Sequence, residues 1–413
     1  MTHFLTEFPN QQNLLEGYPE PVILPVNCHV HTPYSFSAFT EIAQIFEMAR
    51  NEQVAVVGIN DFFVTDGYGP FYQEALKSGI FPLFNIEFIG LLKQEQQQGI
   101  RINDPNNPGR CYFSGKGLDF PFSLEDRLNQ RLTRMVAESQ DQVRSMIEKV
   151  NDWFTAIHAE LRFSYDEIRT RYAKNLVRER HIAKAIRMAV FERVHTDEQR
   201  NLLLTTIFGG KTPKSNLHDI PGLENEIRSN LLKTGGKAFV EEDDSTFMNL
   251  GEIIETIVRA GGIPCYPVLL DDANGNYTEY EKDPLHLMQE LRNRNIGCIE
   301  LIPGRNDASH LERFIRFFHE RNFVIMLGTE HNTPDRLPLT CDTRGKTPLS
   351  PEVRRISYEG ACVVAAHQYL RAKGMTGFLD GNGTPRNGDR DSFVRLGNAI
   401  IHHFIQSFIR NKQ

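Results

Sequence analysis

The chain has 413 residues, of which 40% are hydrophobic and 24% charged, so it suits two domains or one large domain with an insertion. Its net charge of −7 argues against wholesale binding to nucleic-acid backbones. We find no signal-peptide pattern, and no apolar run approaches the ~20 residues of a membrane-spanning helix. The six cysteines form no CxxC pair, so neither a zinc ribbon nor a disulfide framework is predicted. These features favour a reduced, cytoplasmic protein.

The first third of the chain alternates short apolar runs with helical patterns. VILPVNCH precedes the helix-like EIAQIFEMARNE, VAVVGIND precedes PFYQEALKSG, and FPLFNIEFIG follows directly. Apolar strands that alternate with amphipathic helices predict a parallel α/β sheet.

Residues 121–245 break this alternation. A long helical stretch is predicted to begin after Ser123 as N-cap, with Glu125 and Asp126 in its first turn. SYDEIRTRYA, VRERHIAKAIRMAVFERV and DEQRNLLLTTIFG continue the helical pattern. We therefore predict a helical insertion at 121–245 that divides an α/β barrel into residues 1–120 and 246–413.

The last third returns to alternation. EIIETIVRAGG leads into IPCYPVLL, DPLHLMQELRNRN into IGCIELIP, and ASHLERFIRFFHERN into FVIMLGTEH, before two C-terminal helical stretches. A polar side chain stands at or near the end of almost every predicted strand, where a parallel barrel gathers its reactive groups. These residues are His29, His31, Asp61, Glu87, Tyr266, Glu300, Glu330 and His331. His29 and His31 are two apart in a strand, so they point to the same face.

In order, the motifs HVHTPYS, GINDFF, LFNIEF, AGGIPCYPV, GCIEL and LGTEH resemble the polymerase and histidinol phosphatase (PHP) superfamily. Within the insertion, RERHIAKAI and LLKTGGKAFV are similar to the PHP phosphoesterases that hydrolyse nucleotide phosphates. The resemblance covers about residues 22–335. It implies a distorted (β/α)₇ barrel of PHP type with an α-helical insertion, and divalent metals at the C-terminal ends of the strands.

The resemblance assigns one complete set of metal ligands. His29, His31 and Glu87 match the family pattern, and Glu330 stands where aspartate is usual. Two imidazoles with two carboxylates suit zinc, manganese or iron.

Two further metal sites of the family are degenerate in this chain. Tyr112 and Tyr266 stand at histidine positions, and Phe36 and Phe62 at the ligand positions of the third metal. A neutral phenol is a poor ligand and phenylalanine cannot bind a metal. We expect one divalent metal, or none. Both tyrosines are either packing residues or hydroxyls that donate to the substrate.

Three strand-end residues have two interpretations each. Asp61 either orients a histidine or caps the following turn. His331 either donates to a phosphate and acts as a general acid, or is bonded to a backbone carbonyl. Glu300 is either a solvated charge at the end of its strand, which we favour, or part of the site.

Within the insertion, Arg180, His181 and Lys237 resemble the phosphate-contacting basic residues of the nucleotide-hydrolysing relatives. Those relatives carry arginine two residues before the histidine, where this chain has Glu179. The register is shifted by one, so Arg180 could equally belong to a charged helix face, and Lys237 could occupy an ordinary glycine-rich turn.

These patterns predict a PHP-type phosphoesterase-like protein that hydrolyses or binds a small phosphorylated substrate, such as a nucleotide, at a single-metal site. The alternative is an inactive relative that binds a ligand or a protein. Because most ligands of two metals are missing, the sequence leaves catalysis open. A nucleic-acid-associated module is disfavoured by the acidic charge and the absence of a polymerase segment.

Overall fold

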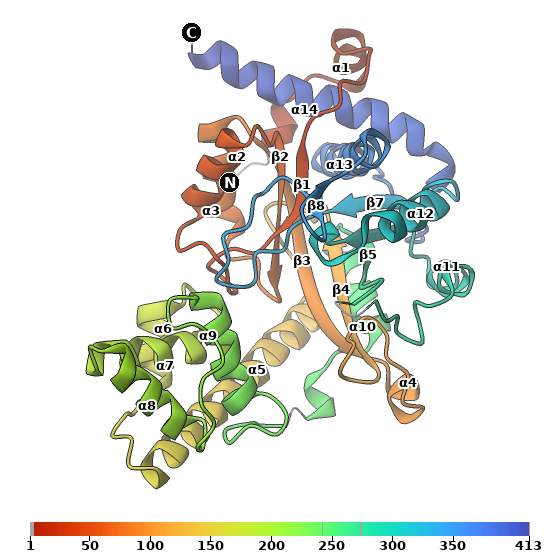
Figure 1. The fold of residues 1–413 in the computed structure, drawn as a ribbon. Coiled ribbons are helices and arrows are strands. Elements are labelled where there is room, and N and C mark those ends of the chain that lie inside the picture. Colours follow the sequence, from red (N-terminus) through yellow and green to blue (C-terminus); the bar gives the residue numbers. More distant parts are fainter. Residues whose placement is uncertain (1–3, 242, 273–274, 413) are drawn as a thin grey trace.

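A computed structural model of the chain describes residues 4–241, 243–272 and 275–412. A seven-stranded sheet with strand order β1 to β7 forms its centre (Figure 1). The strands are β1 (Val26–Val30), β2 (Val56–Phe62), β3 (Phe81–Leu91), β4 (Arg110–Lys116), β5 (Ile263–Val268), β6 (Cys298–Leu301) and β7 (Val324–Leu327). A parallel bridge between Val30 and Glu330 brings the two edges together. The sheet thus closes nearly into a barrel, which confirms the predicted (β/α)₇ fold.

β4 departs from the expected parallel sheet, because it pairs antiparallel with both β3 and β5. The segment between β3 and β4 contains only the short helix α4 (Lys93–Gln97). Antiparallel neighbours need no long crossover, so the chain returns at the end of the barrel where β3 finishes. As a result β4 begins at the barrel mouth, where the parallel strands end, and places Lys116 deep in the barrel.

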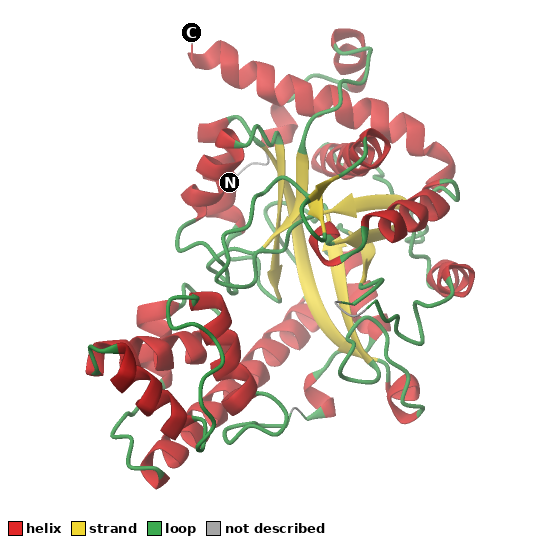
Figure 2. Cartoon of the chain, in the orientation of Figure 1, coloured by secondary structure: helices red, strands yellow, loops and turns green. Residues whose placement is uncertain are grey.

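The remaining strands are linked by helices that cover the outside of the barrel (Figure 2). These are α2 (Ile42–Asn51), α3 (Tyr68–Ser78), α10 (Leu250–Arg259), α11 (Pro284–Asn293) and α12 (Ala308–His319). In α10, Asn249 caps the first turn in a capping box with Glu252, and Ile253 and Ile257 are buried. The short strands β8 (Asp342–Thr343) and β9 (Thr347–Pro348) form a small separate sheet.

The terminal segments close the end of the barrel opposite the insertion (Figure 1). They comprise α1 (Gln11–Gly17), α13 (Pro351–Ala372) and α14 (Arg390–Lys412). α13 is buried along most of its length, and a side chain at Gly360 would collide with the carbonyl of Ile325 in β7. Among the described residues, no helix is both long and apolar enough to cross a membrane.

The insertion is helical, as predicted, and lies between β4 and β5. It contains α5 (Asp126–Ala156), α6 (Tyr165–Tyr172), α7 (Glu179–Arg193), α8 (Asp197–Ile207) and α9 (Ile220–Ile227), followed by a π-helical turn at Arg228–Leu232. Residues 121–125 are not helical and α5 begins at Asp126. Glu125 therefore occupies the N-cap position, and not Ser123 as predicted. The insertion has its own hydrophobic core, separate from that of the barrel, which includes Phe154, Ile182 and Leu204. The domain boundaries at 121 and 245 stay a prediction.

Candidate metal centre and its cavity

Three potential metal ligands converge at the mouth of the barrel. His29 lies in β1, His31 follows it, and Glu87 lies in β3. His31 Nε2 is 3.3 Å from His29 Nε2 and 3.2 Å from Glu87 Oε2, and the last two atoms are 3.9 Å apart. Ligand atoms about 2.1 Å from a tetrahedral zinc ion would lie about 3.4 Å from one another. The three side chains therefore form a group that could hold one metal ion.

The contacts behind the two rings set their protonation. His29 Nδ1 is 2.9 Å from Glu300 Oε2, so Nδ1 carries the hydrogen and Nε2 keeps its lone pair. His31 Nδ1 is 3.2 Å from Ser35 Oγ, whose hydroxyl donates to Asp61 Oδ1 at 2.6 Å. Ser35 can then only accept from His31 Nδ1–H, and His31 Nε2 also keeps a lone pair.

Two imidazole lone pairs thus face an oxygen of Glu87. Glu87 Oε2 is buried and has no hydrogen-bond partner. Burial raises the pKa of Glu87 to about 8 and lowers the pKa of His31 to about 4. The raised pKa of Glu87 reflects the cost of burying its negative charge, and a cation at the centre of the group would offset that cost. The residues present therefore fit a divalent metal.

Glu300 is not the solvated charge expected from the sequence. It lies in β6 and is only 1% exposed, because the barrel brings its carboxylate against His29 and Lys116. Burial would raise the pKa of Glu300, but Lys116 and His29 hold it well below its ordinary value. Glu300 therefore stays an acceptor that orients His29.

Asp61 combines the two interpretations given to it. Its Oδ1 accepts the backbone N–H of Thr32 at 2.7 Å, which fixes the turn after β1, and it reaches His31 through Ser35. Asp61 is fully buried and does not line the cavity. Its catalytic role stays a prediction, and its contacts indicate positioning.

Glu330 and His331 lie where β7 returns to β1, both with positive φ (69° and 56°). The carboxylate of Glu330 forms an ion pair with Arg305, so its role as a metal ligand stays a prediction. His331 is buried, with Nδ1 2.8 Å from Thr329 Oγ1 and Nε2 2.7 Å from the carbonyl of Leu337. Both ring nitrogens are engaged and the side chain does not line the cavity, so its contacts do not support a role as general acid.

Phe36 and Phe62 place aromatic rings against two histidines. Phe62 stacks on His31, with ring centroids 4.8 Å apart and an angle of 24° between the planes. Phe36 meets His181 edge to face at 4.8 Å. The positions that the resemblance assigns to the third metal are thus filled by apolar rings, one of which, Phe62, lies against the three-donor group.

The two tyrosines at histidine positions differ. Tyr112 lines the cavity, and burial raises its pKa well above the ordinary value, so its phenol stays neutral. Tyr266 is buried elsewhere and donates to Glu281 Oε1 at 2.9 Å, which indicates a structural hydrogen bond and not a substrate contact.

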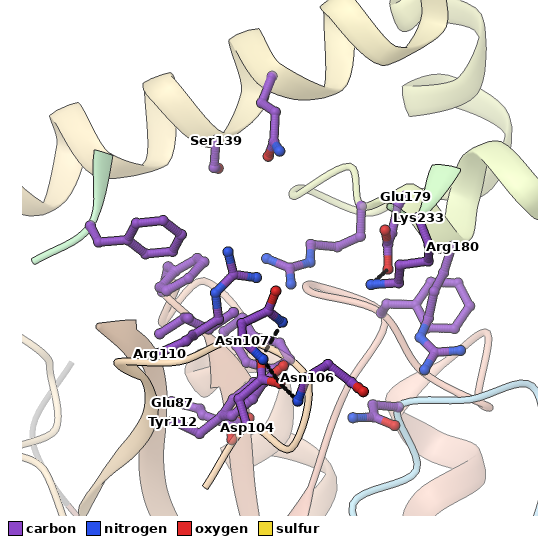
Figure 3. A pocket seen from close by; sticks show the side chains of 18 of the residues that line it. Glu87, Asp104, Asn106, Asn107, Arg110, Tyr112, Ser139, Glu179, Arg180 and Lys233 are labelled. Carbon is purple, nitrogen blue, oxygen red and sulfur yellow. Dashed lines mark hydrogen bonds and ion pairs between the residues drawn. The ribbon is translucent and has the colours of Figure 1, made fainter. Parts of the chain in front are cut away.

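A cavity of about 730 Å³ separates the barrel mouth from the insertion (Figure 3). His29 and Glu87 lie in its barrel wall, with Tyr112 nearby, and α5 passes over the opposite side with Ser139 facing inward. The insertion contributes four basic residues to the lining, Arg178, Arg180, Arg228 and Lys233. The cavity thus combines a potential cation site with a basic wall.

The cations of this wall differ in their partners. Glu179 pairs with Arg228 and with Lys233, the latter at 2.8 Å. Arg180 hydrogen-bonds Asn225 Oδ1 at 3.2 Å, and burial together with Arg228 lowers its pKa to about 10. Arg180 therefore lies in the cavity as predicted, although its role there stays a prediction.

Sequence reasoning missed Arg178, the N-cap residue of α7. Its guanidinium lies 4.7 Å from the ring centroid of Phe62, on which His31 also stacks, and makes no ion pair with any described residue. The sequence did hold a signal for Arg178: Glu179 stands where the relatives carry arginine, and it has an arginine on each side, either of which could take that role.

The other two basic candidates lie outside the cavity. His181 is buried, and its Nδ1 accepts the backbone N–H of Arg178 at 2.9 Å. Lys237 lies over the ring of Trp153, 5.2 Å from its centroid. Their contacts support the folding of the insertion, and their substrate-binding roles stay predictions.

Comparison with known proteins agrees with this architecture. The model of the PHP domain family matches residues 27–196, which confirms the resemblance seen in the motifs. A search of curated proteins finds no match. The "putative metal-dependent phosphoesterase" from Bifidobacterium adolescentis is 14% identical with a TM-score of 0.51, over 82% of this chain and 96% of that chain. An amidohydrolase from Chromobacterium violaceum, with bound sulfate and no metal, is 14% identical with a TM-score of 0.52, over 81% and 96%.

Proposed function

With a PHP domain established over residues 27–196, we propose that the chain is a metal-dependent hydrolase that acts on a small phosphorylated substrate at a single-metal site. One observation carries the proposal: the three-donor group and the guanidinium of Arg178, which has no ion pair with any described residue, flank the same ring of Phe62 at the cavity. A cation site beside an arginine can bind a phosphate ester, because both groups interact strongly with phosphate oxygens. The name of the phosphoesterase that shares the fold supports this class of reaction.

His29, His31 and Glu87 would hold the metal, with Glu330 as the candidate fourth ligand. When bound, a divalent metal at such a site lowers the pKa of a water molecule and polarises a phosphoryl oxygen. Zinc, manganese and iron all suit this donor set.

The protein groups around the metal would bind and orient the substrate. Arg178 can donate two parallel hydrogen bonds to phosphate oxygens, and Phe62 holds its guanidinium plane in place. Arg180 adds positive charge to the same wall. The cavity volume of about 730 Å³ falls within the ~300–1,000 Å³ of small-ligand sites, which favours a small molecule over a polymer.

The surroundings of the three donors support one metal over several. Phe36 and Phe62 offer no ligand atom, and the phenol of Tyr112 stays neutral because burial raises its pKa. A second or third divalent ion would bring further positive charge, and neither the two phenylalanines nor the neutral tyrosine can balance it.

The test is hydrolysis of a generic phosphate ester, p-nitrophenyl phosphate, with Mn²⁺ added to the purified chain. We expect turnover that disappears in Glu87→Gln. Metal binding with no turnover of p-nitrophenyl phosphate or of a panel of small phosphate esters would contradict hydrolysis and favour the inactive, ligand-binding relative. Absence of both metal binding and turnover would overturn the proposal altogether.

A further inference from the structure

A lysine lies buried beneath the three-donor group, in a part of the barrel that the proposed reaction does not use. Lys116 is at the deep end of β4 and is 0% exposed. Its Nζ lies 2.6 Å from Glu300 Oε2 and 3.0 Å from Asn60 Oδ1. A fully buried lysine is rare and costly unless it is paired, and breaking such a pair leaves an uncompensated charge. Its position therefore calls for an explanation.

Both side chains that Lys116 contacts also touch the ring of His29. Glu300 Oε2, which accepts from Lys116, is the same oxygen that lies 2.9 Å from His29 Nδ1. Asn60 Nδ2 lies 3.0 Å from His29 Nε2 and 3.3 Å from Nδ1. Through these two groups the lysine acts on one potential metal ligand without touching it.

An ammonium group has only donors, so it fixes which way each partner faces. The amide of Asn60 must turn its oxygen to Lys116, which directs its nitrogen toward His29. The carboxylate of Glu300 is held on both sides, because Ser114 Oγ donates to Oε1 at 2.5 Å while Lys116 donates to Oε2. Ser114 and Lys116 are two apart in β4 and therefore share a face.

We propose that Lys116 is a positioning residue of the metal centre: it holds Glu300 so that Glu300 accepts from His29 Nδ1–H, which leaves Nε2 as the basic nitrogen on the side of His31 and Glu87. This inference rests on the proposed function, since it assigns a purpose to the metal-binding form of His29. Because β4 runs antiparallel and enters from the mouth, its last residue, Lys116, reaches the barrel interior below the site.

The experiment measures Zn²⁺ affinity by competition with a chromophoric chelator, and Co²⁺ ligation by visible absorption, in the full chain. Lys116→Met keeps the length of the side chain but removes its charge. We expect about 10- to 100-fold weaker Zn²⁺ binding, the usual cost of removing a group that orients a metal ligand. The Co²⁺ spectrum should change as well, because the orientation of His29 is altered.

Arg187→Met is the matched control. It breaks the ion pair between Arg187 and Glu224, 2.8 Å apart and largely buried, in the insertion and outside the cavity. This variant should lose stability through the same kind of defect, yet keep the Zn²⁺ affinity of the unaltered chain. Equal losses of affinity in both variants would show that Lys116 acts only through stability, and would overturn the inference.

A double variant, Lys116→Met with Glu300→Gln, covers the case in which the single change prevents folding. It removes both charges, so stability should recover. Its Zn²⁺ affinity should stay at least 10-fold below that of the unaltered chain. Recovery of full affinity together with stability would overturn the positioning role. Absence of Zn²⁺ binding by the unaltered chain would instead overturn the proposed function itself, so the two failures are distinguishable.

Discussion

The two walls of the cavity are built differently. On the barrel wall, His29, His31 and Glu87 are buried, and each imidazole is fixed from behind by an acceptor. On the insertion wall, Arg178 lies against the rings of Phe62 and Phe63, and Lys233 pairs with the carboxylate of Glu179. The difference indicates a division of labour: the rigid wall is suited to one cation, whose ligands need fixed geometry, and the looser wall to an anionic group.

Charge separates the walls as well. On the barrel wall, burial raises the pKa of Glu87 to about 8, and among the described residues its Oε2 has no hydrogen-bond donor. On the insertion wall, Arg178 has no ion-pair partner among those residues. By contrast, Glu179 is fully engaged: burial would raise its pKa, but Arg228 and Lys233 lower it to about 2. A metal would satisfy one unpaired group and a phosphate the other. Substitutions on each wall should therefore affect different steps.

The largest effect is expected on the barrel wall. Glu87→Gln keeps the shape of the side chain but removes the only anion of the three-donor group. We expect hydrolysis of p-nitrophenyl phosphate to fall by on the order of 1,000-fold, since several kcal/mol of charge stabilisation come from the metal. Added Mn²⁺ or Zn²⁺ should no longer raise the melting temperature. Unchanged metal stabilisation in this variant would show that the cation binds elsewhere.

A smaller effect is expected on the insertion wall. Arg178→Met should lower kcat/KM by about 100-fold, the usual cost of losing one charged donor to a developing charge. Zn²⁺ affinity should stay unchanged, because Arg178 does not belong to the three-donor group. Arg169→Met, an exposed arginine of α6 outside the cavity, is the control and should leave both quantities intact. If Arg178→Met abolishes metal binding, the division between the walls is wrong.

The smallest effect concerns the stability of the insertion. Burial lowers the pKa of His181 to about 3. Between this value and its ordinary pKa near 6.5 the unfolded chain binds a proton that the folded chain does not, so stability is lost as the pH falls through this window. From pH 7 to pH 5, we expect His181 to contribute a decrease of roughly 2 kcal/mol in the free energy of unfolding.

Trp153 in α5 provides the readout, since it is the single tryptophan of the chain. Urea unfolding followed by its fluorescence should show a smaller pH dependence in His181→Asn, whose side-chain oxygen can still accept from Arg178 N–H. An identical pH dependence in both proteins would mean that His181 is not buried in its neutral form.

The sequence predicted those features that depend on local pattern. Strand ends with polar residues gave His29, His31 and Glu87, because β-alternation and the mouth of a barrel bring such residues together. The helical insertion followed from periodicity. β4 itself was not predicted, because its sequence, RCYFSGK, interrupts the apolar residues with charged and small polar ones.

The features that sequence reasoning misplaced depend on tertiary packing. Glu300 was taken for a solvated charge because its partner Lys116 is 184 positions away in the chain. Arg178 was overlooked in favour of Arg180, since only the packing of α7 against Phe62 shows which arginine faces the three-donor group. Lys237 seemed suited to a phosphate, yet its side chain lies over Trp153.

The most direct test of the account is the metal content of the purified chain, measured by mass spectrometry after loading with Mn²⁺ or Zn²⁺ and removal of excess ion. We predict about one divalent metal per chain, lost in His31→Ala. Two or more metals per chain would contradict the single-metal site. A content at background level, or one unaffected by His31→Ala, would contradict a metal centre at the barrel mouth.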